Sequence, residues 1–159
     1  MEKIILILFF LSLTCNAKTI VCFTPGEDCE RLFVEAINNA KINIEVQEYH
    51  LTNPAIVNAL LQAFERKVNI RIILDKVSKK EAIPFLNVGI PVWIDNTVRI
   101  AHNKVMIIDQ AIIIGGSYNP TESAQKYNAE NLLIMDDTEI IKRYYWNFEN
   151  RINKSKKYF

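Results

Sequence analysis

Residues 42–74 read as a strand, a helix and a second strand in succession, and this order constrains the fold more than any other feature of the chain. Apolar and polar residues alternate over residues 42–46, which is typical of a strand. Asn53 followed by Pro54 marks a helix start, and apolar residues recur at helical spacing after it. A nearly continuous apolar run over residues 68–74 favours a buried strand. Such a unit predicts parallel pairing through a right-handed crossover.

The other segments extend this unit into one domain without internal repeats or low-complexity linkers. The charged residues 76–80 are expected to form a loop, and the basic tail with Lys154, Lys156 and Lys157 is expected to be frayed. We predict a single α/β domain over residues 18–159, whose mixed, largely parallel β-sheet is flanked by helices. Further strands are expected at residues 18–23, 89–94, within the 101–119 hairpin and at 132–135, and helices from Asp28 and at residues 81–87 and 138–151.

The first seventeen residues predict a secretory signal peptide. Lys3 precedes an apolar run over residues 4–13, and small residues follow up to Ala17. The run is shorter than the roughly 20 apolar residues that a membrane-spanning helix needs. We therefore expect cleavage after Ala17 and a periplasmic or secreted bacterial protein. An uncleaved membrane anchor is the alternative, because Glu2 offsets the charge of Lys3.

Two cysteines of the expected mature chain, Cys22 and Cys29, flank the turn signal Thr24-Pro25-Gly26. In an oxidising compartment they could close a small disulfide loop. The alternative is a pair of free, half-buried thiols.

The net charge of the chain is +1, so it carries no global field that would attract nucleic acid. Any polyanion would have to bind a local basic patch, with solvated surface charges as the simpler alternative. The candidates for such a patch are Arg66, Lys67, Arg71, Lys76, Lys79, Lys80 and Arg99.

Polar side chains interrupt the apolar segment 101–119. His102 and Lys104 lie two residues apart, so in a strand they would project from one face, whereas Asp109 has the opposite parity. Ser117 and Asn119 follow two glycines that permit a change of direction. Taken separately, these residues would suit an exposed strand face and an ordinary turn.

Taken together, the same residues suit phosphate chemistry. An imidazole such as that of His102 can attack phosphorus or protonate a leaving oxygen. Lys104 and Asn119 are donors for the non-bridging oxygens. We expect no metal and no cofactor, because a protonated lysine cannot ligate and no cysteine or second histidine lies at ligand spacing. His50, the only other histidine, is interpreted as a loop residue.

The spacing of His102-x-Lys104, Asp109 and Gly116-Ser117-x-Asn119 resembles the HxKxxxxD…GSxN signature of the phospholipase D superfamily, known as the HKD motif. The surrounding chain, from "VCFTPGEDC" to "NAENLLIM", is similar to the short, single-motif bacterial branch of Nuc-like endonucleases. Six residue identities hold at fixed spacing, which makes the signature specific.

This resemblance implies roles for the residues that match. His102 would be the nucleophile that forms a phosphohistidine, Lys104 and Asn119 would bind the phosphate, and Ser117 would support the site through hydrogen bonds. Asp109 would be mainly structural. Glu130 falls where the family has a carboxylate that orients the histidine, an arrangement that stabilises positive charge on the ring.

One residue departs from the family pattern. Pro120 follows Asn119 where relatives usually carry an aromatic residue, which would alter the pocket wall without removing a catalytic group.

The chain carries one copy of the motif, yet in-line displacement needs one group to attack and another to protonate the leaving oxygen. A two-fold homodimer would supply both groups from one sequence. The expected function is a metal-independent phosphodiesterase that cleaves nucleic acid, DNA in preference to RNA. One alternative is a phospholipase that releases phosphatidic acid, which needs an apolar entrance that the sequence does not locate. Another is an exported DNA-binding or uptake protein.

Overall fold

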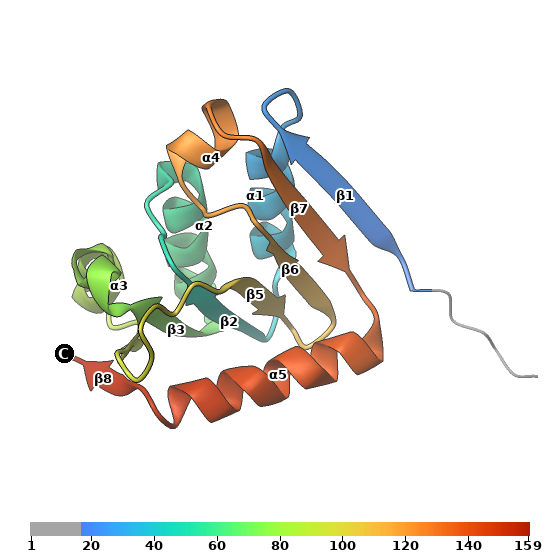
Figure 1. The fold of residues 1–159 in the computed structure, drawn as a ribbon. Coiled ribbons are helices and arrows are strands. Elements are labelled where there is room, and N and C mark those ends of the chain that lie inside the picture. Colours follow the sequence, from blue (N-terminus) through green and yellow to red (C-terminus); the bar gives the residue numbers. More distant parts are fainter. Residues whose placement is uncertain (1–16) are drawn as a thin grey trace, which may run out of the picture.

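The computed structural model describes residues 17–159, which form one eight-stranded sheet with helices on both faces (Figure 1). The expected signal peptide lies, apart from Ala17, outside the described residues. The strands are β1 (Thr19–Thr24), β2 (Asn43–Glu48), β3 (Asn69–Asp75), β4 (Val92–Asp95), β5 (Lys104–Ile108), β6 (Ile112–Gly116), β7 (Glu130–Met135) and β8 (Lys156–Tyr158). The helices are α1 (Cys29–Asn39), α2 (Pro54–Glu65), the 3₁₀ segment η1 (Lys76–Ala82), α3 (Ile83–Asn87), α4 (Glu122–Lys126) and α5 (Thr138–Ile152).

The sheet is mixed, as predicted, but it is not largely parallel. The strand order is β1-β7-β6-β5-β2-β3-β4-β8, and only the β2–β3 and β3–β4 pairs are parallel. The other five pairs are antiparallel. The crossover helices explain the difference, because they occur only between β2 and β4, whereas the 104–116 segment folds back on itself as a hairpin.

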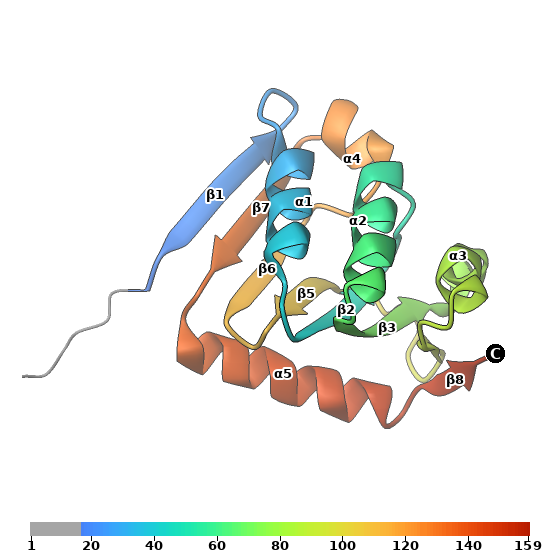
Figure 2. The same cartoon turned by 180° about the vertical axis from the view of Figure 1, so that it is seen from behind.

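Each face of the sheet packs against helices (Figure 2). Helices α1 and α2 cover one face, and their apolar stripes meet residues such as Ile44 and Val46 of β2. Helix α5 covers part of the other face, where Ile141 and Phe148 join the smaller core cluster. The central strand β2 is therefore buried on both faces. Within residues 17–159, no helix combines the length and the apolar character that crossing a membrane requires.

Two segments that were predicted to lack regular structure are ordered. The charged stretch after β3 forms η1, whose first turn is capped by the Asp75 carboxylate accepting from the Val77 amide. The basic tail forms β8, which pairs antiparallel with β4, so that Ile94 lies opposite Lys156. Strand β4 is therefore not an edge strand. Proline occurs in sheets mainly on edge strands or at the start of a strand, and Pro91 fits the second case because it directly precedes β4.

Cys22 and Cys29 form a disulfide, which confirms the disulfide loop suggested by the sequence and not the pair of free thiols. Their Cα atoms lie 5.7 Å apart, and both side chains are buried. The bond joins β1 to the first turn of α1.

Candidate active site

The residues of the HKD motif other than Asp109 converge because several strands begin or end at one edge of the sheet. Strand β2 ends there at Glu48, which lies opposite Lys104, the first residue of β5. Strand β6 ends there just before Ser117, and the neighbouring β7 begins there at Glu130. Antiparallel register therefore brings together side chains that are up to 82 positions apart in the chain, from Glu48 to Glu130.

His102 and Lys104 do not share a strand face, contrary to the sequence-based prediction. His102 is exposed and lies in the loop before β5, whereas Lys104 is buried at the start of that strand. The Lys104 ammonium donates a hydrogen bond of 3.0 Å to the His102 carbonyl oxygen. The ammonium thus ties down the backbone that carries the imidazole and leaves the ring accessible.

Tyr49, which follows β2, links the two motif residues. Its ring centroid lies 4.6 Å from that of His102, and the Lys104 Nζ atom lies 5.1 Å from the Tyr49 centroid. The second distance is within the range of a cation–π contact. Tyr49 therefore contributes one wall of the site.

Glu48 places a buried carboxyl group beside Lys104. Burial raises the pKa of Glu48 well above its ordinary value, although the Lys104 charge acts in the opposite direction. Burial lowers the pKa of Lys104, and this effect is opposed by Glu48 and then by Glu130. Glu48 Oε2 is buried and has no hydrogen-bond partner within residues 17–159. The site thus holds a buried carboxyl group and an ammonium group whose pKa values are both shifted by burial, and such shifts are common at functional sites.

Ser117 and Glu130 form a hydrogen-bonded pair across β6 and β7. The Ser117 hydroxyl donates to Glu130 Oε2 at 2.6 Å and accepts from the Asn131 amide at 3.1 Å. The second Glu130 oxygen accepts from Asn128 at 3.0 Å. These are the side-chain partners of Glu130 in the described part of the chain, and the expected bond to the His102 ring is not among them. Glu130 is therefore oriented by Ser117.

Gly116 permits this close approach of the two strands. A Cβ atom at this position would lie 2.2 Å from the Asn131 carbonyl oxygen, and the residue has a φ angle of +143°. A side chain here would push β6 away from β7 and displace Ser117.

Asn119 lies at the same edge, and its Oδ1 atom is buried without a hydrogen-bond partner in the described residues. The next residue, the divergent Pro120, is buried, and its carbonyl oxygen accepts from the amides of Thr52 and Asn53, both at 2.9 Å. Pro120 therefore joins the site to the start of α2, while the Asn119 amide still has unused hydrogen-bonding capacity.

Asp109 lies at the other end of β5, away from these residues. Its carboxylate accepts hydrogen bonds from the amides of residues 41, 42 and 43, at 2.9, 2.7 and 3.0 Å. Asp109 and Gln110 both have positive φ angles, as a tight hairpin turn requires. These contacts agree with the structural role that the resemblance implied for Asp109.

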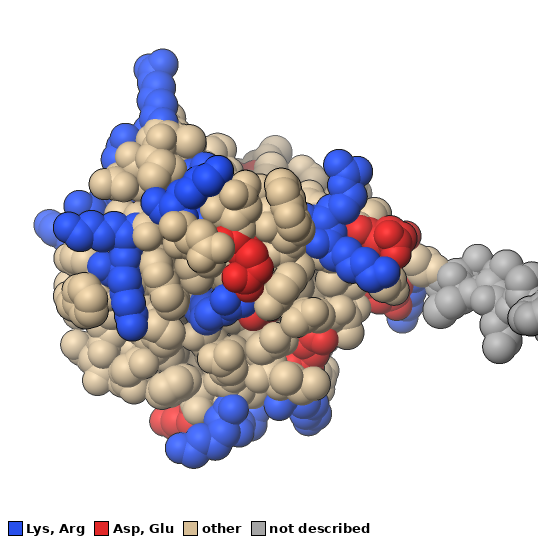
Figure 3. Space-filling model, turned by 90° about the horizontal axis from the view of Figure 1, so that it is seen from below, with Lys and Arg blue, Asp and Glu red and all other residues tan. Residues whose placement is uncertain are grey.

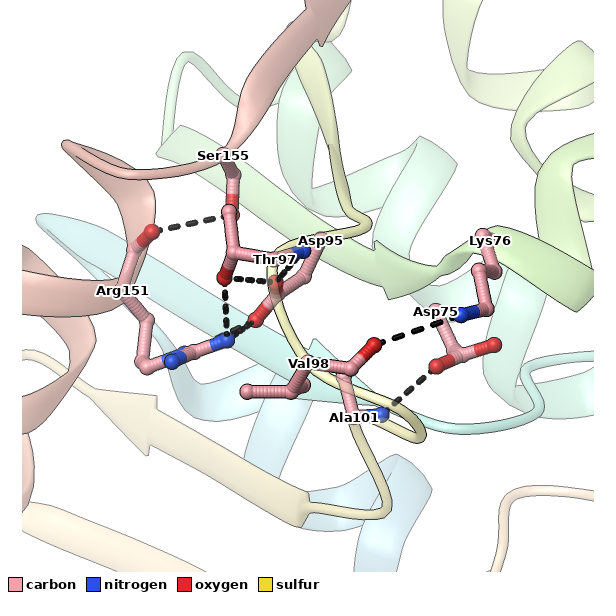
Figure 4. Close-up of polar contacts among 8 residues, drawn as sticks. All are labelled: Asp75, Lys76, Asp95, Thr97, Val98, Ala101, Arg151 and Ser155. Carbon is pink, nitrogen blue, oxygen red and sulfur yellow. Dashed lines mark hydrogen bonds and ion pairs between the residues drawn. The ribbon is translucent and has the colours of Figure 1, made fainter.

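The loop that carries His102 is anchored at several points (Figure 4). Asp75, at the end of β3, accepts from the Ala101 amide at 2.6 Å, and Lys76 donates to the Val98 carbonyl oxygen at 3.3 Å. Arg151, in the last turn of α5, pairs with the buried Asp95 at the end of β4. These contacts fix the position of the loop that carries His102 relative to β3, β4 and α5.

Of the proposed basic patch, only part lies near the site. Arg71 is paired with Glu45 and Glu149 beneath α5, at 3.0 and 2.5 Å, and is removed from the patch. Arg66 donates to carbonyl groups at the end of α1. Figure 3 shows a concentration of Lys and Arg at the end of the molecule where η1 and β8 lie. The exposed basic residues of these segments, of the turn before β8 and of the loop before β5 are Lys76, Lys79, Lys80, Arg99, Lys154, Lys156 and Lys157.

Comparison with known proteins places the chain in a family. Residues 33–152 match a family model described as "Cardiolipin synthase, PLD-like domain". A phospholipase D of Rickettsia felis is 39% identical over 140 residues, which cover 86% of this chain and 70% of the relative. The chain belongs to the phospholipase D superfamily. A mitochondrial cardiolipin hydrolase of Xenopus laevis, another superfamily relative, is 31% identical over 138 residues, covering 83% of this chain and 65% of that protein.

Solved structures support the same assignment for this superfamily member. The crystal structure of Nuc from Salmonella typhimurium, a phospholipase D family member, superposes with a TM-score of 0.83 at 27% identity and covers 90% of this chain and 99% of that one. NucT from Helicobacter pylori gives a TM-score of 0.82 at 25% identity, with 90% and 100% covered. The chain is therefore a phosphodiesterase of the phospholipase D superfamily.

Proposed function

We propose that this phosphodiesterase is a nuclease that cleaves DNA, with RNA as a less favoured substrate, through a phosphohistidine on His102. The observation that carries the proposal is an exposed His102 beside Lys104, at an edge of the sheet that also carries exposed lysines and Arg99. Positive charge beside a catalytic group favours a polyanionic strand, because contacts with several phosphates contribute to its binding.

The chemistry follows from the positions of the side chains. One nitrogen of the His102 imidazole attacks phosphorus, a P–N bond forms, and the bond to the leaving oxygen breaks. Lys104 and Asn119 bind the non-bridging oxygens, whose charge grows during the attack. Water then attacks phosphorus and releases the histidine. We propose that these reaction steps need no metal ion. Within residues 17–159, no three His, Cys, Asp or Glu side chains are grouped for metal binding.

The leaving oxygen needs a proton, and we assign its source to His102 of a second subunit in a two-fold homodimer. The exposed position of His102 supports this arrangement, because the ring is accessible from outside the subunit. We expect specific activity to fall when the protein is diluted below the dissociation constant of the dimer, measured alongside its sedimentation. A monomer with undiminished activity would contradict this assignment.

Phospholipid hydrolysis to phosphatidic acid is the second candidate. Val98 and Ile100, in the loop before His102, are 38% and 52% exposed and could contact a lipid. The relatives named phospholipase D and cardiolipin hydrolase are consistent with this alternative. The Cys22–Cys29 disulfide supports export in either case, because disulfides persist in oxidising compartments.

One assay separates these candidates. The purified protein is incubated in EDTA with plasmid DNA, single-stranded DNA or phosphatidylcholine vesicles. We expect nicking of the plasmid or cleavage of the single strand to persist in EDTA, with little release of phosphatidic acid. Loss of DNA cleavage on chelation would contradict the proposed chemistry, and turnover of lipid alone would favour the second candidate.

A further inference from the structure

The second histidine, His50, is held in a fixed orientation beside the active site. Its Nδ1 atom lies 2.7 Å from Glu81 Oε1 and 2.9 Å from Ser78 Oγ, both on η1. The Ser78 hydroxyl donates its proton to the Tyr49 carbonyl oxygen at 2.5 Å, and the carboxylate of Glu81 has no proton to donate. His50 Nδ1 must therefore carry the proton that both oxygens accept, which leaves Nε2 for another partner.

The Glu81 carboxylate is itself oriented, because its second oxygen accepts from the Leu51 amide at 2.6 Å. A carboxylate that is fixed in this way holds the tautomer and the orientation of the imidazole that it contacts. The His50 side chain is 37% exposed, whereas that of Glu81 is 16% exposed. The arrangement thus pairs a half-buried carboxylate with an accessible ring.

Tyr49 places His50 next to the catalytic histidine. The Tyr49 ring centroid lies 4.4 Å from that of His50 and 4.6 Å from that of His102. One aromatic ring therefore contacts both imidazoles. A ligand whose reacting phosphate lies at His102 could extend past the Tyr49 ring and reach His50 with its next group.

Beyond His50 the surface is hollowed between α2 and η1. A groove of about 430 Å³ is lined by Leu51, Lys80 and Glu81, together with residues of α2 and α3. Lys80 is exposed, and it lies next to the carboxylate that holds His50. The groove thus combines the Lys80 ammonium and the Glu81 carboxylate with apolar walls, and His50 directly precedes Leu51, one of its lining residues.

We propose that His50 and Lys80 bind the backbone phosphate adjacent to the scissile phosphodiester in a nucleic acid. This inference rests on the proposed nuclease function and specifies how a strand is distinguished from a lipid with one phosphodiester. The imidazolium of His50 donates from Nδ1 to Glu81 and from Nε2 to a phosphate oxygen, and Lys80 adds a second charge-assisted contact. His50 is a binding residue and takes no part in the transfer of the scissile phosphoryl group.

The test compares two substrates that differ by one phosphate. The thymidine dinucleotide has only the scissile phosphodiester, whereas the trinucleotide also has a flanking one. We expect the wild-type protein to prefer the trinucleotide in kcat/KM, and His50→Gln to reduce that preference about tenfold, mainly through KM. Lys80→Ala should reduce it about threefold. Lys41→Ala removes an exposed charge at the opposite end of β2 and should leave the preference unchanged.

The outcomes separate this proposal from the nuclease proposal. An unchanged preference in both His50→Gln and Lys80→Ala, or an equal loss on both substrates, would overturn the phosphate subsite and leave nuclease activity standing. No cleavage of either oligonucleotide by the wild-type protein would overturn both proposals. Lys80→Ala keeps the test decisive if His50→Gln fails to fold, because the Lys80 side chain is exposed.

Discussion

Replacing His102 by alanine is expected to abolish phosphodiester hydrolysis, with kcat falling at least about a thousandfold. The imidazole is the only group at this edge that we assign as the attacking nucleophile, and Lys104 and Asn119 cannot replace it. The ring is exposed, so its loss should leave the free energy of unfolding nearly unchanged. Initial rates on plasmid DNA and on bis(p-nitrophenyl) phosphate, measured alongside urea unfolding, provide the check.

The same variant tests the covalent intermediate. Wild-type protein quenched in alkali after mixing with ³²P-labelled DNA should retain the label, and His102→Ala should not. Activity within tenfold of wild type on both substrates would show that His102 is not the nucleophile. A large fall in the free energy of unfolding would instead assign the effect to folding.

The sequence was sufficient to predict the superfamily from the segment that carries the HKD motif, but not the geometry of that segment. Fixed spacing identified His102 and Lys104, because the signature depends on local residue order. It could not show that β5 starts only at Lys104, since that boundary depends on pairing with β2 and β6. The opposite parity of Asp109 predicted that its side chain points away from His102 and Lys104. Its contact with the Ile42 amide agrees with that prediction, because the hairpin turn is a local feature.

The residues that were missed lie on β2 or immediately after it. Alternation over residues 42–46 suggested that one face of β2 is polar, but the strand lies in the centre of the sheet and buries Glu45 and Glu48. A single-sequence pattern cannot reveal that α5, more than 90 residues away, covers the second face. One available signal was the position of Glu48 and Tyr49 at the carboxyl end of a predicted parallel strand, where ligands commonly bind in α/β sheets.

The basic tail illustrates the same limit. Lys156 and Lys157 have the composition of a frayed end, and the preference of such residues for solvent is strong. Their backbone nevertheless completes the sheet by pairing with β4, a contact between segments about 60 residues apart. Main-chain pairing with a distant edge carries no side-chain signature, so composition alone gave the wrong prediction.

The ion pair between Arg151 and Asp95 should be the most important polar contact for the stability of the loop that carries His102 (Figure 4). Asp95 is completely buried and accepts from Arg151 Nε at 2.8 Å and from the Thr97 hydroxyl at 2.8 Å. Arg151→Met should lower the free energy of unfolding by about 3 kcal/mol, because it leaves a buried carboxylate without its counter-charge. Urea unfolding at pH 7 measures the loss.

Arg143→Met is the matched control, because Arg143 lies on the same helix with an exposed side chain. Its effect should stay within about 0.5 kcal/mol. The double variant Asp95→Asn, Arg151→Met should be less destabilised than Arg151→Met alone, since no buried charge then remains. Equal losses in the two would show that Arg151 acts through packing of its side chain.

The acid dependence provides a second, independent measurement. Burial raises the pKa of Asp95, but the hydrogen bonds from Arg151 and Thr97 outweigh this effect and hold the pKa below its ordinary value. A carboxyl group whose pKa is lowered in the fold contributes stability above its unfolded pKa, near 4, and loses it as the pH falls through the folded value. Without Arg151 the folded-state pKa of Asp95 should rise, so the stability difference between wild type and Arg151→Met should be full at pH 7 and shrink as the pH falls through the folded-state pKa values of Asp95 in the two proteins. A difference that persists undiminished at pH 2 would contradict an electrostatic origin, and the anchoring of the His102 loop would then have to be assigned to packing against α5.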